Sequence, residues 1–163
     1  TPTHASIIRL ILYKNLKPEK QVAYKLEIVP TIKVAGLAVG ETGLSDMLAI
    51  DDSHFYSIER SYLPLAHKNI IRLFKNTVTD KTTDISKMDA LEGKSIKTVE
   101  KELLSDLEDF KGQMATNFQN LDNIEGICFG PTLANGHETI ILISDNNFSK
   151  KQRTQLLAFE IIP

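Results

Sequence analysis

The 163-residue chain is long enough for one domain, and 42% hydrophobic with 25% charged residues is the composition of an ordinary globular protein. Nineteen Lys and Arg against 21 Asp and Glu give a net charge of −2. This argues against nucleic-acid binding, which needs a basic face to neutralise phosphates. No apolar run approaches the roughly 20 residues of a membrane-spanning helix.

Short strand-like runs follow one another along the whole chain and are separated by turn residues. The clearest is Gln21–Val29, in which apolar residues alternate with polar or small ones, as in a strand buried on one face. In chain order, the predicted strands are Ser6–Tyr13, Gln21–Val29, Leu44–Ile50, His54–Arg60, Asn69–Asn76, Ile124–Phe129, Glu138–Ser144 and Thr154–Ile162. The sequence therefore predicts an all-β fold.

Turn residues set the expected boundaries of these strands. Pro18 and Pro30 are expected to end the first two, and Asp51-Asp52 is expected to turn a hairpin. Asn135-Gly136 is a strong signal for a tight turn between the sixth and seventh strands. Thr77–Gly93 is polar and is predicted to be a loop.

The segment Ser95–Lys111 fits two different structures. Its large apolar residues recur close to every 3.6 positions, which is typical of an amphipathic helix. Its early part, Lys97–Leu104, also fits a strand. Periodicity alone favours the helix.

Two internal similarities suggest repeated units. Ser6–Leu10 is echoed by Asn69–Leu73, and Leu44–Asn76 and Ile124–Ile162 show the same series of strand, turn, strand, loop and strand. Short antiparallel strands that repeat in this way suggest a β-propeller with four-stranded blades. The blade pieces would be residues 6–29, 44–104 and 124–162. About two and a half blades cannot close a ring, so we expect the chain to be part of a larger single propeller domain.

Polar residues at the strand ends are the candidates for a functional site. Familiar motifs fail: the first glycine of a phosphate-binding loop is missing before Gly93-Lys94-Ser95, and the four histidines lack metal-ligand spacing. The candidates are Asp46, Glu59, Arg60, Asn123, Glu125, Asp145, Asn146 and Asn147. In a propeller, first strands line the central channel and the loops after second strands gather at one rim, so these side chains could converge.

Such a set fits two kinds of chemistry and has simpler interpretations as well. Oxygen ligands from several loops suit Ca²⁺, and neighbouring carboxylates raise one another's pKa, giving a general acid beside a base. However, Asp145-Asn146-Asn147 also fits a plain turn, and Glu59-Arg60 fits a structural ion pair between blades. Glu125 interrupts an apolar run, where a carboxylate must face water or be paired.

These residues lie in stretches that resemble a known family, the esterase-like phytase domain. The stretches are Gly43–Asp52, Glu59–Tyr62, Asn123–Ile127 with Gly130-Pro131, Gly136, Ser144–Phe148 and Gln152–Gln155. They are similar to the C-terminal half of the family domain, so the resemblance implies that its N-terminal half is a partner. Family members are typically exported bacterial hydrolases, which implies a periplasmic or secreted protein. The family pattern also implies a strand at Lys97–Leu104, followed by a helical turn from about Ser105 to Lys111.

The resemblance and the polar residues together predict a hydrolase of phosphate or carboxylate esters with a small-molecule substrate. Glu125, Asp145 and Glu59 are the expected catalytic residues, and Asp46, Glu125 and Asp145 the expected Ca²⁺ ligands. The expected substrate-binding residues are Arg60, Asn123, Asn146 and Asn147. The alternative is a propeller that binds or scaffolds without catalysis, in which the carboxylates are structural.

Overall fold

The computed structural model describes residues 5–28, 32–34, 37–116 and 120–162, and the regular secondary structure of this part is almost entirely β-strand. The strands are β1 (Ile7–Lys14), β2 (Lys17–Lys25), β3 (Ile32–Val34), β4 (Leu37–Val39), β5 (Glu41–Ala49), β6 (His54–Leu63), β7 (Lys68–Thr77), β8 (Glu100–Asp106), β9 (Ile124–Phe129), β10 (Thr139–Ser144) and β11 (Leu156–Glu160). Two short 3₁₀ helices accompany them, η1 (Pro64–Ala66) and η2 (Leu107–Gln113). All strand pairs are antiparallel.

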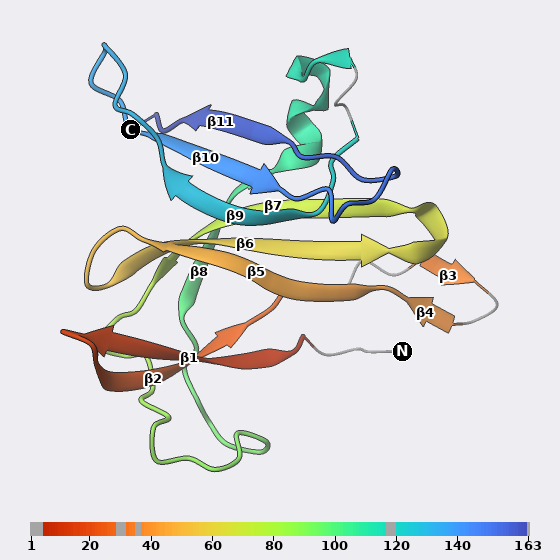
Figure 1. The fold of residues 1–163 in the computed structure, drawn as a ribbon. Coiled ribbons are helices and arrows are strands. Elements are labelled where there is room, and N and C mark those ends of the chain that lie inside the picture. The colour runs from red at the N-terminus through yellow and green to blue at the C-terminus, as the bar shows by residue number, and fades with distance from the viewer. Residues whose placement is uncertain (1–4, 29–31, 35–36, 117–119, 163) are drawn as a thin grey trace.

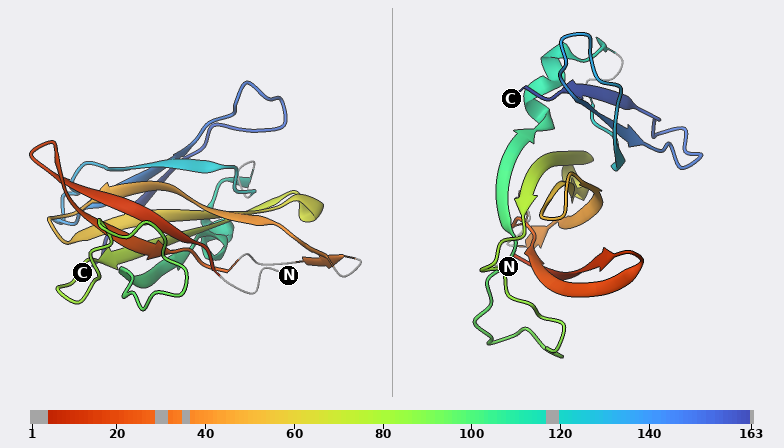
Figure 2. Two further views of the ribbon diagram at one scale, coloured as in Figure 1. Left: turned by 90° about the horizontal axis from the view of Figure 1, so that it is seen from below. Right: turned by 90° about the vertical axis from the view of Figure 1, so that its left-hand side faces the viewer.

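Three sheets lie in layers, as Figures 1 and 2 show. The four-stranded sheet β5-β6-β7-β8 is the middle layer, the β1–β2 hairpin lies on one of its faces, and the sheet β11-β10-β9 lies on the other. The small β3–β4 hairpin projects at one end of the stack. The middle sheet is therefore covered on both faces, and its strand β6 contacts a different layer on each side.

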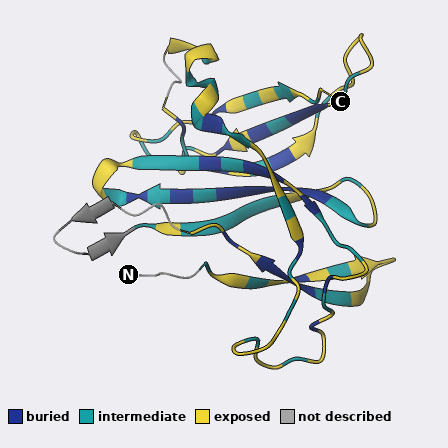
Figure 3. Cartoon of the chain, turned by 180° about the vertical axis from the view of Figure 1, so that it is seen from behind, coloured by how far each residue is buried: buried dark blue, intermediate teal, exposed yellow. Residues whose placement is uncertain are grey.

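Strand β6 is buried along nearly its whole length because each of its faces meets a different layer. Tyr56 and Ile58 belong to the core shared with β9–β11, whereas Phe55 belongs to the core shared with the hairpin. Since successive side chains point to opposite faces of a strand, Arg60 lies on the same face as Tyr56 and Ile58, and Glu59 lies on the same face as Phe55. Figure 3 shows the same distribution, with buried positions along the middle sheet and exposed ones in the loops.

The larger core lies between the β5–β8 and β9–β11 sheets. The middle sheet supplies Ile58 and Ile71, and the β9–β11 sheet supplies Ile124 and Leu142, all four fully buried. Helix η2 closes the side of this core, where the ring of its Phe110 meets Phe159 of β11 edge to face, with centroids 5.2 Å apart. Burial of apolar surface is the main force that holds the two sheets together.

The smaller core lies under the β1–β2 hairpin and includes Val22, Tyr24 and Phe55. The outer edge of β2 is covered by the long loop between β7 and β8. There the amide of Ile85 donates to the carbonyl of Gln21 at 2.9 Å, and the amide of Val99 donates to the carbonyl of Ala23 at 2.9 Å. The loop thus covers an edge that would otherwise be open to pairing with another chain.

The all-β prediction is confirmed, and the predicted strands match observed ones with shifts of a few residues at their ends. The strand and the helical turn that the family pattern implies within Ser95–Lys111 are confirmed as β8 (Glu100–Asp106) and η2 (Leu107–Gln113), so the single helix that periodicity alone favours is wrong. The expected strand break at Pro18 is wrong as well. Pro18 lies inside β2, opposite Tyr13 beside a register shift, where a bulge tolerates a residue without an amide proton.

Other expectations have mixed outcomes. The turn at Asn135-Gly136 is confirmed, with Gly136 at φ 85°, a conformation that favours glycine. Pro30 lies outside the described residues, and the β3–β4 hairpin was not predicted. The described residues form no closed ring or barrel, so the division into propeller blades stays a prediction. They include no helix that is long and apolar enough to cross a membrane.

Candidate functional site

A hollow of about 1210 Å³ opens at the end of the layers where β6 turns into β7. Its wall is built from the end of β6, the β6–β7 turn, η2, the segment before β9 and the loop after β10. Its charged wall residues are Arg60, Lys68, Lys111, Asp122, Lys151 and Arg153. We call this site the basic hollow.

Arg60 reaches the basic hollow because of its place on β6. Its side chain lies on the same face as Ile58, towards the β9–β11 sheet, but beyond the end of the apolar core. Its guanidinium lies 3.7 Å from the carboxylate of Glu41. The Glu41 side chain is 70% exposed, and an ion pair at this distance with an exposed partner is weak, so Arg60 remains able to bind another anion.

Glu108 joins two lysines at the wall of the hollow. Its carboxylate lies 2.7 Å from the ammonium of Lys68 in β7 and 2.8 Å from that of Lys111 in η2. The side chain of Asp106 accepts a hydrogen bond from the amide of Glu108 at 3.1 Å and so starts η2. Burial alone would raise the pKa of Glu108, but the two ammonium groups outweigh it and leave that pKa below its ordinary value of 4.5.

This lowered pKa predicts how stability changes in acid. A carboxylate with a depressed folded-state pKa stabilises the fold fully above its ordinary pKa, and the contribution is lost as pH falls through the folded value. We expect Glu108→Gln to reduce the loss of unfolding free energy between about pH 5 and about pH 3, measured by urea unfolding. Glu92→Gln, at an exposed position in the long loop, is the control. An identical pH dependence in both variants would contradict the expectation.

Gln155 is 2% exposed and bonds to two residues on the wall of the hollow, Asn120 and Asp122. Its amide nitrogen donates to the carbonyl of Asn120 at 2.9 Å, and its amide oxygen accepts from the backbone of Asp122 at 2.8 Å. The Asp122 carboxylate in turn accepts from the backbone amide of Arg153 at 2.6 Å. These bonds hold the segment before β9 against the loop after β10 and so give the hollow a fixed shape.

Two predicted residues, Asn123 and Glu125, lie together at the start of β9. Asn123 lines the basic hollow, and its amide nitrogen donates to the carboxylate of Glu125. Glu125 is the extra residue at a register shift opposite Ile143 and Ser144, and its side chain is exposed. This explains how an acidic residue fits into an apolar run: the bulge leaves it on the surface.

The loop after β10 contains three further predicted residues. Asp145 directly follows β10, so the antiparallel pairing of β9 and β10 places it at the same end of the sheet as Glu125. Asn146 holds a turn, because its side chain accepts from the amide of Phe148 at 3.0 Å and its carbonyl from that of Ser149 at 2.8 Å. Asn147 follows in the left-handed region, at φ 48°. Of this turn, only Ser149 reaches the wall of the hollow.

Asp46 joins two sheets and lies outside the basic hollow. Its carboxylate accepts from the backbone amide of Ile127 in β9 at 2.9 Å and from that of Met47 at 2.8 Å. It lies at the register shift of β5. The bond to Ile127 connects the middle sheet to the next one, which is a structural task.

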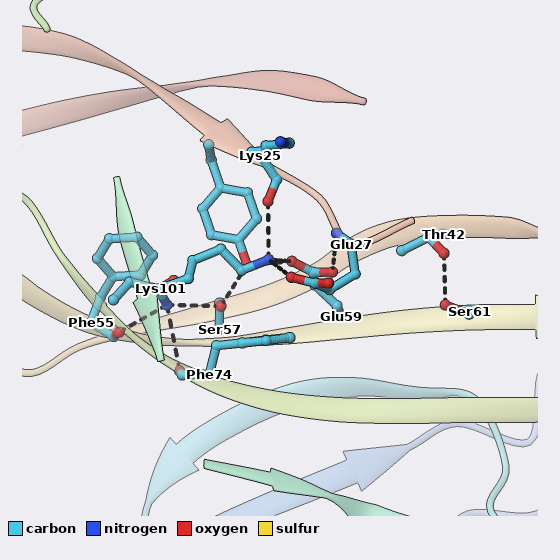
Figure 4. Close-up of polar contacts among 11 residues, drawn as sticks. Lys25, Glu27, Thr42, Phe55, Ser57, Glu59, Ser61, Phe74 and Lys101 are labelled. Atoms are coloured by element: carbon cyan, nitrogen blue, oxygen red, sulfur yellow. Dashed lines mark hydrogen bonds and ion pairs between the residues drawn. The ribbon is translucent and has the colours of Figure 1, made fainter. Parts of the chain in front are cut away.

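Glu59 is deeply buried, on the opposite side of the middle sheet from the hollow. It is 2% exposed and pairs with Lys101 of β8, whose side chain is 11% exposed. Its carboxylate also accepts from the hydroxyl of Tyr24 at 2.7 Å and from the amide of Glu27 at 2.8 Å. Figure 4 shows Lys101 reaching between the two glutamates, with Ser57 beside them. The ion-pair interpretation of Glu59 therefore fits, but with Lys101 as the partner in place of Arg60.

The Tyr24 hydroxyl completes this buried network. Burial raises the pKa of Tyr24 far above its ordinary value, and the neighbouring Glu59 carboxylate raises it further, whereas the Ser57 hydroxyl acts in the opposite sense. The phenol therefore stays protonated and can donate to Glu59. Asn76 donates to Ser57 at 2.8 Å and links the network to β7.

The expected calcium ligands are not gathered at one place. Among the described residues, no three Asp, Glu, His or Cys side chains group closely enough to hold a metal ion. Asp46 lies on β5 with its carboxylate bonded to backbone amides, whereas Glu125 and Asp145 are at the end of the β9–β10 pair. The described residues therefore contain no preassembled set of these three ligands. Calcium binding by them stays a prediction, and no chemical step below passes through a metal.

A Ser, His and Asp set occurs in the β5–β6 turn but lacks the arrangement of a catalytic triad. The Ser53 hydroxyl and the Asp51 carboxylate approach the same ring nitrogen of His54, Nδ1, at 3.2 and 2.9 Å. In a triad, the nucleophile and the acid contact opposite ring nitrogens. Asp51 instead accepts from the amides of Ser53 and His54, both at 2.8 Å, and stabilises the turn.

Comparison with known proteins gives one match. A family model described as "Phytase-like: Esterase-like activity of phytase" matches residues 1–148, which is most of the chain. No curated protein matches significantly, and neither does any solved structure.

Proposed function

The chain belongs to the phytase-like family, and on that membership we propose that the protein is a hydrolase of phosphate or carboxylate esters whose substrate binds in the basic hollow. The observation that carries the proposal is that two predicted substrate-binding residues, Arg60 and Asn123, line the same hollow. Glu125, a predicted catalytic residue, is hydrogen-bonded to one of them. The hollow thus combines an anion-binding group with an adjacent carboxylate.

The proposed chemistry uses water as the nucleophile. Glu125 accepts a proton from water while the water oxygen bonds to the phosphorus or acyl carbon of the ester. The bond from that atom to the alcohol oxygen breaks, and the leaving oxygen takes up the proton that Glu125 accepted, which returns Glu125 to its carboxylate form. Arg60 holds an anionic oxygen of the substrate with its planar guanidinium, and the amide of Asn123 orients the Glu125 carboxylate.

We expect Glu125→Gln to lower turnover by about 100-fold or more, because an amide cannot accept the proton that general-base catalysis transfers. The assay uses 4-nitrophenyl phosphate and 4-nitrophenyl acetate, with added calcium and with a chelator. Glu102→Gln, at an exposed position of β8, is the matched control. Equal turnover in the two variants, or no hydrolysis of either ester by the unaltered protein, would count against the proposal.

The family resemblance supports two further proposals. The stacked antiparallel sheets, one of them a four-stranded meander, would be blades of a β-propeller. The protein would act in the periplasm or outside the cell. A calcium ion bound by Asp46, Glu125 and Asp145 stays a separate prediction, which the chelator arm of the assay addresses.

The second candidate function is a non-catalytic binding module. It is favoured by Asp46 and Glu59, two carboxylates predicted for the site, whose oxygens are bonded within the fold. In such a module, Glu125→Gln would change only stability or the affinity for a partner. The turnover assay therefore separates the two functions.

A further inference from the structure

The wall of the basic hollow has more positive than negative charge, although the whole chain is slightly acidic. Five Lys and Arg side chains line it against one carboxylate, Asp122. Glu41 and Glu108 pair with three of the cations, and counting them still leaves five cations against three anions. The chain as a whole has a net charge of −2. A cleft with one sign of charge raises the local concentration of ligands of the opposite sign.

Within the hollow, Lys68 and Lys111 form a preorganised pair. Each ammonium lies within 2.8 Å of the same carboxylate, that of Glu108, so the two groups are neighbours and their mutual repulsion is offset. Their side chains are 41% and 29% exposed. An ammonium has three N–H donors, so each lysine keeps donors for a ligand while Glu108 holds it in place.

We propose that Lys68 and Lys111 form a subsite for a phosphoryl group, and that they make the site select phosphate esters over uncharged carboxylate esters. This inference rests on the proposed hydrolase function for its substrate, but the subsite itself is a binding property. Two ammonium groups that already share one carboxylate still have one unit of positive charge in excess. A phosphate monoester carries a charge of about −1.5 to −2 at neutral pH, so it gains from both lysines. An uncharged ester gains from neither.

The surrounding groups support a phosphoryl ligand. Arg60 and Arg153 lie on the wall of the same hollow, and planar guanidinium groups suit phosphate oxygens. Asp122, the carboxylate on the wall, accepts hydrogen bonds from the backbone amides of Asn123 and Arg153 at 2.8 and 2.6 Å. These amides partly satisfy its charge, which reduces its repulsion of an incoming phosphate.

The test measures binding of inorganic phosphate by calorimetry at constant ionic strength, with acetate as the comparison anion. We expect Lys68→Gln/Lys111→Gln to weaken phosphate binding by about 10-fold or more, because two charge-assisted hydrogen-bond donors are lost. Lys87→Gln/Lys94→Gln removes the same charge at exposed positions of the long loop and should change the affinity by less than about twofold. No phosphate binding by the unaltered protein, or equal weakening in both double variants, would overturn the proposal.

Loss of the two lysines removes both ion-pair partners of Glu108 and could destabilise the fold. A second variant therefore separates loss of phosphate binding from loss of stability. The triple variant Lys68→Gln/Lys111→Gln/Glu108→Gln removes this carboxylate as well and should also lose phosphate binding. Phosphate affinity equal to that of the unaltered protein in a folded triple variant would overturn the subsite.

Hydrolysis of 4-nitrophenyl phosphate and 4-nitrophenyl acetate separates this inference from the proposed function. The expected result is that the Lys68→Gln/Lys111→Gln variant lowers kcat/KM for the phosphate relative to the acetate. Phosphate binding through the lysines without hydrolysis of either ester leaves the subsite standing and removes the hydrolase. Hydrolysis with an unchanged ratio in the variant leaves the hydrolase standing and removes the subsite.

Discussion

Replacing Lys101 with methionine is expected to lower the free energy of unfolding by about 3–5 kcal/mol, because the change leaves the buried Glu59 carboxylate without its cation. Glu59 is 2% exposed, and the Lys101 ammonium also donates to Glu27 and to the carbonyl of Lys25, both at 3.0 Å. The same ammonium lies 4.2 Å from the centre of the Phe74 ring. Methionine fills a similar volume, so the decrease in unfolding free energy comes mainly from the lost charge and only to a small extent from a cavity. Urea unfolding at neutral pH measures it.

A double variant and a surface control make this result specific. Glu59→Gln/Lys101→Met removes both charges but keeps an oxygen that can accept from Tyr24, so it should be more stable than Lys101→Met alone. Lys97→Met replaces an exposed lysine near the start of β8 and should stay within about 0.5 kcal/mol of the unaltered protein. If Lys101→Met behaved like Lys97→Met, the buried pair of Glu59 and Lys101 would not stabilise the fold.

The second large effect is expected at Leu142 of β10. This side chain is fully buried in the core between the β5–β8 and β9–β11 sheets. Leu142→Ala should lower the unfolding free energy by about 2–5 kcal/mol, because it removes buried apolar surface and leaves a cavity. Leu156→Ala, on the neighbouring β11 and 69% exposed, should cost about 0.5 kcal/mol or less.

This pair of leucine variants also bears on the basic hollow. The hollow has one wall on the β6–β7 turn and another on the segments around β9 and β10, so looser packing of the two sheets should weaken phosphate binding as well as stability. Equal unfolding free energies for Leu142→Ala and Leu156→Ala would show that the two sheets do not share the core described here.

Short apolar runs bounded by turn residues were enough to predict most strands, because each of the three layered sheets has at least one face against a core. Periodicity alone failed for Ser95–Lys111, where the β8 strand and η2 together imitate the spacing of one helix. Pairing of β8 with β7 decided that segment, and a sequence window cannot contain such a long-range interaction. Pro18 was misjudged for a similar reason, since the bulge that accommodates it depends on the partner strand.

The candidate site was predictable only in part. Arg60 and Asn123 were expected to bind substrate, and both line the hollow. Lys68, Lys111 and Gln155 were missed, because nothing in their spacing distinguishes them from surface residues or core amides. Glu108 contacts Lys68 across 40 positions of sequence, and Gln155 contacts Asn120 across 35. Only the folded chain brings such residues together.

The two-sided role of β6 limits how this protein can change during evolution. Ile58 belongs to one core, whereas Glu59 meets Lys101 next to the other. Insertion or deletion of a single residue within this strand would exchange the two faces, pushing an isoleucine against an ammonium group and a carboxylate into an apolar layer. Length variation should therefore be confined to the loops, and β6 should tolerate substitution far better than insertion or deletion of a residue.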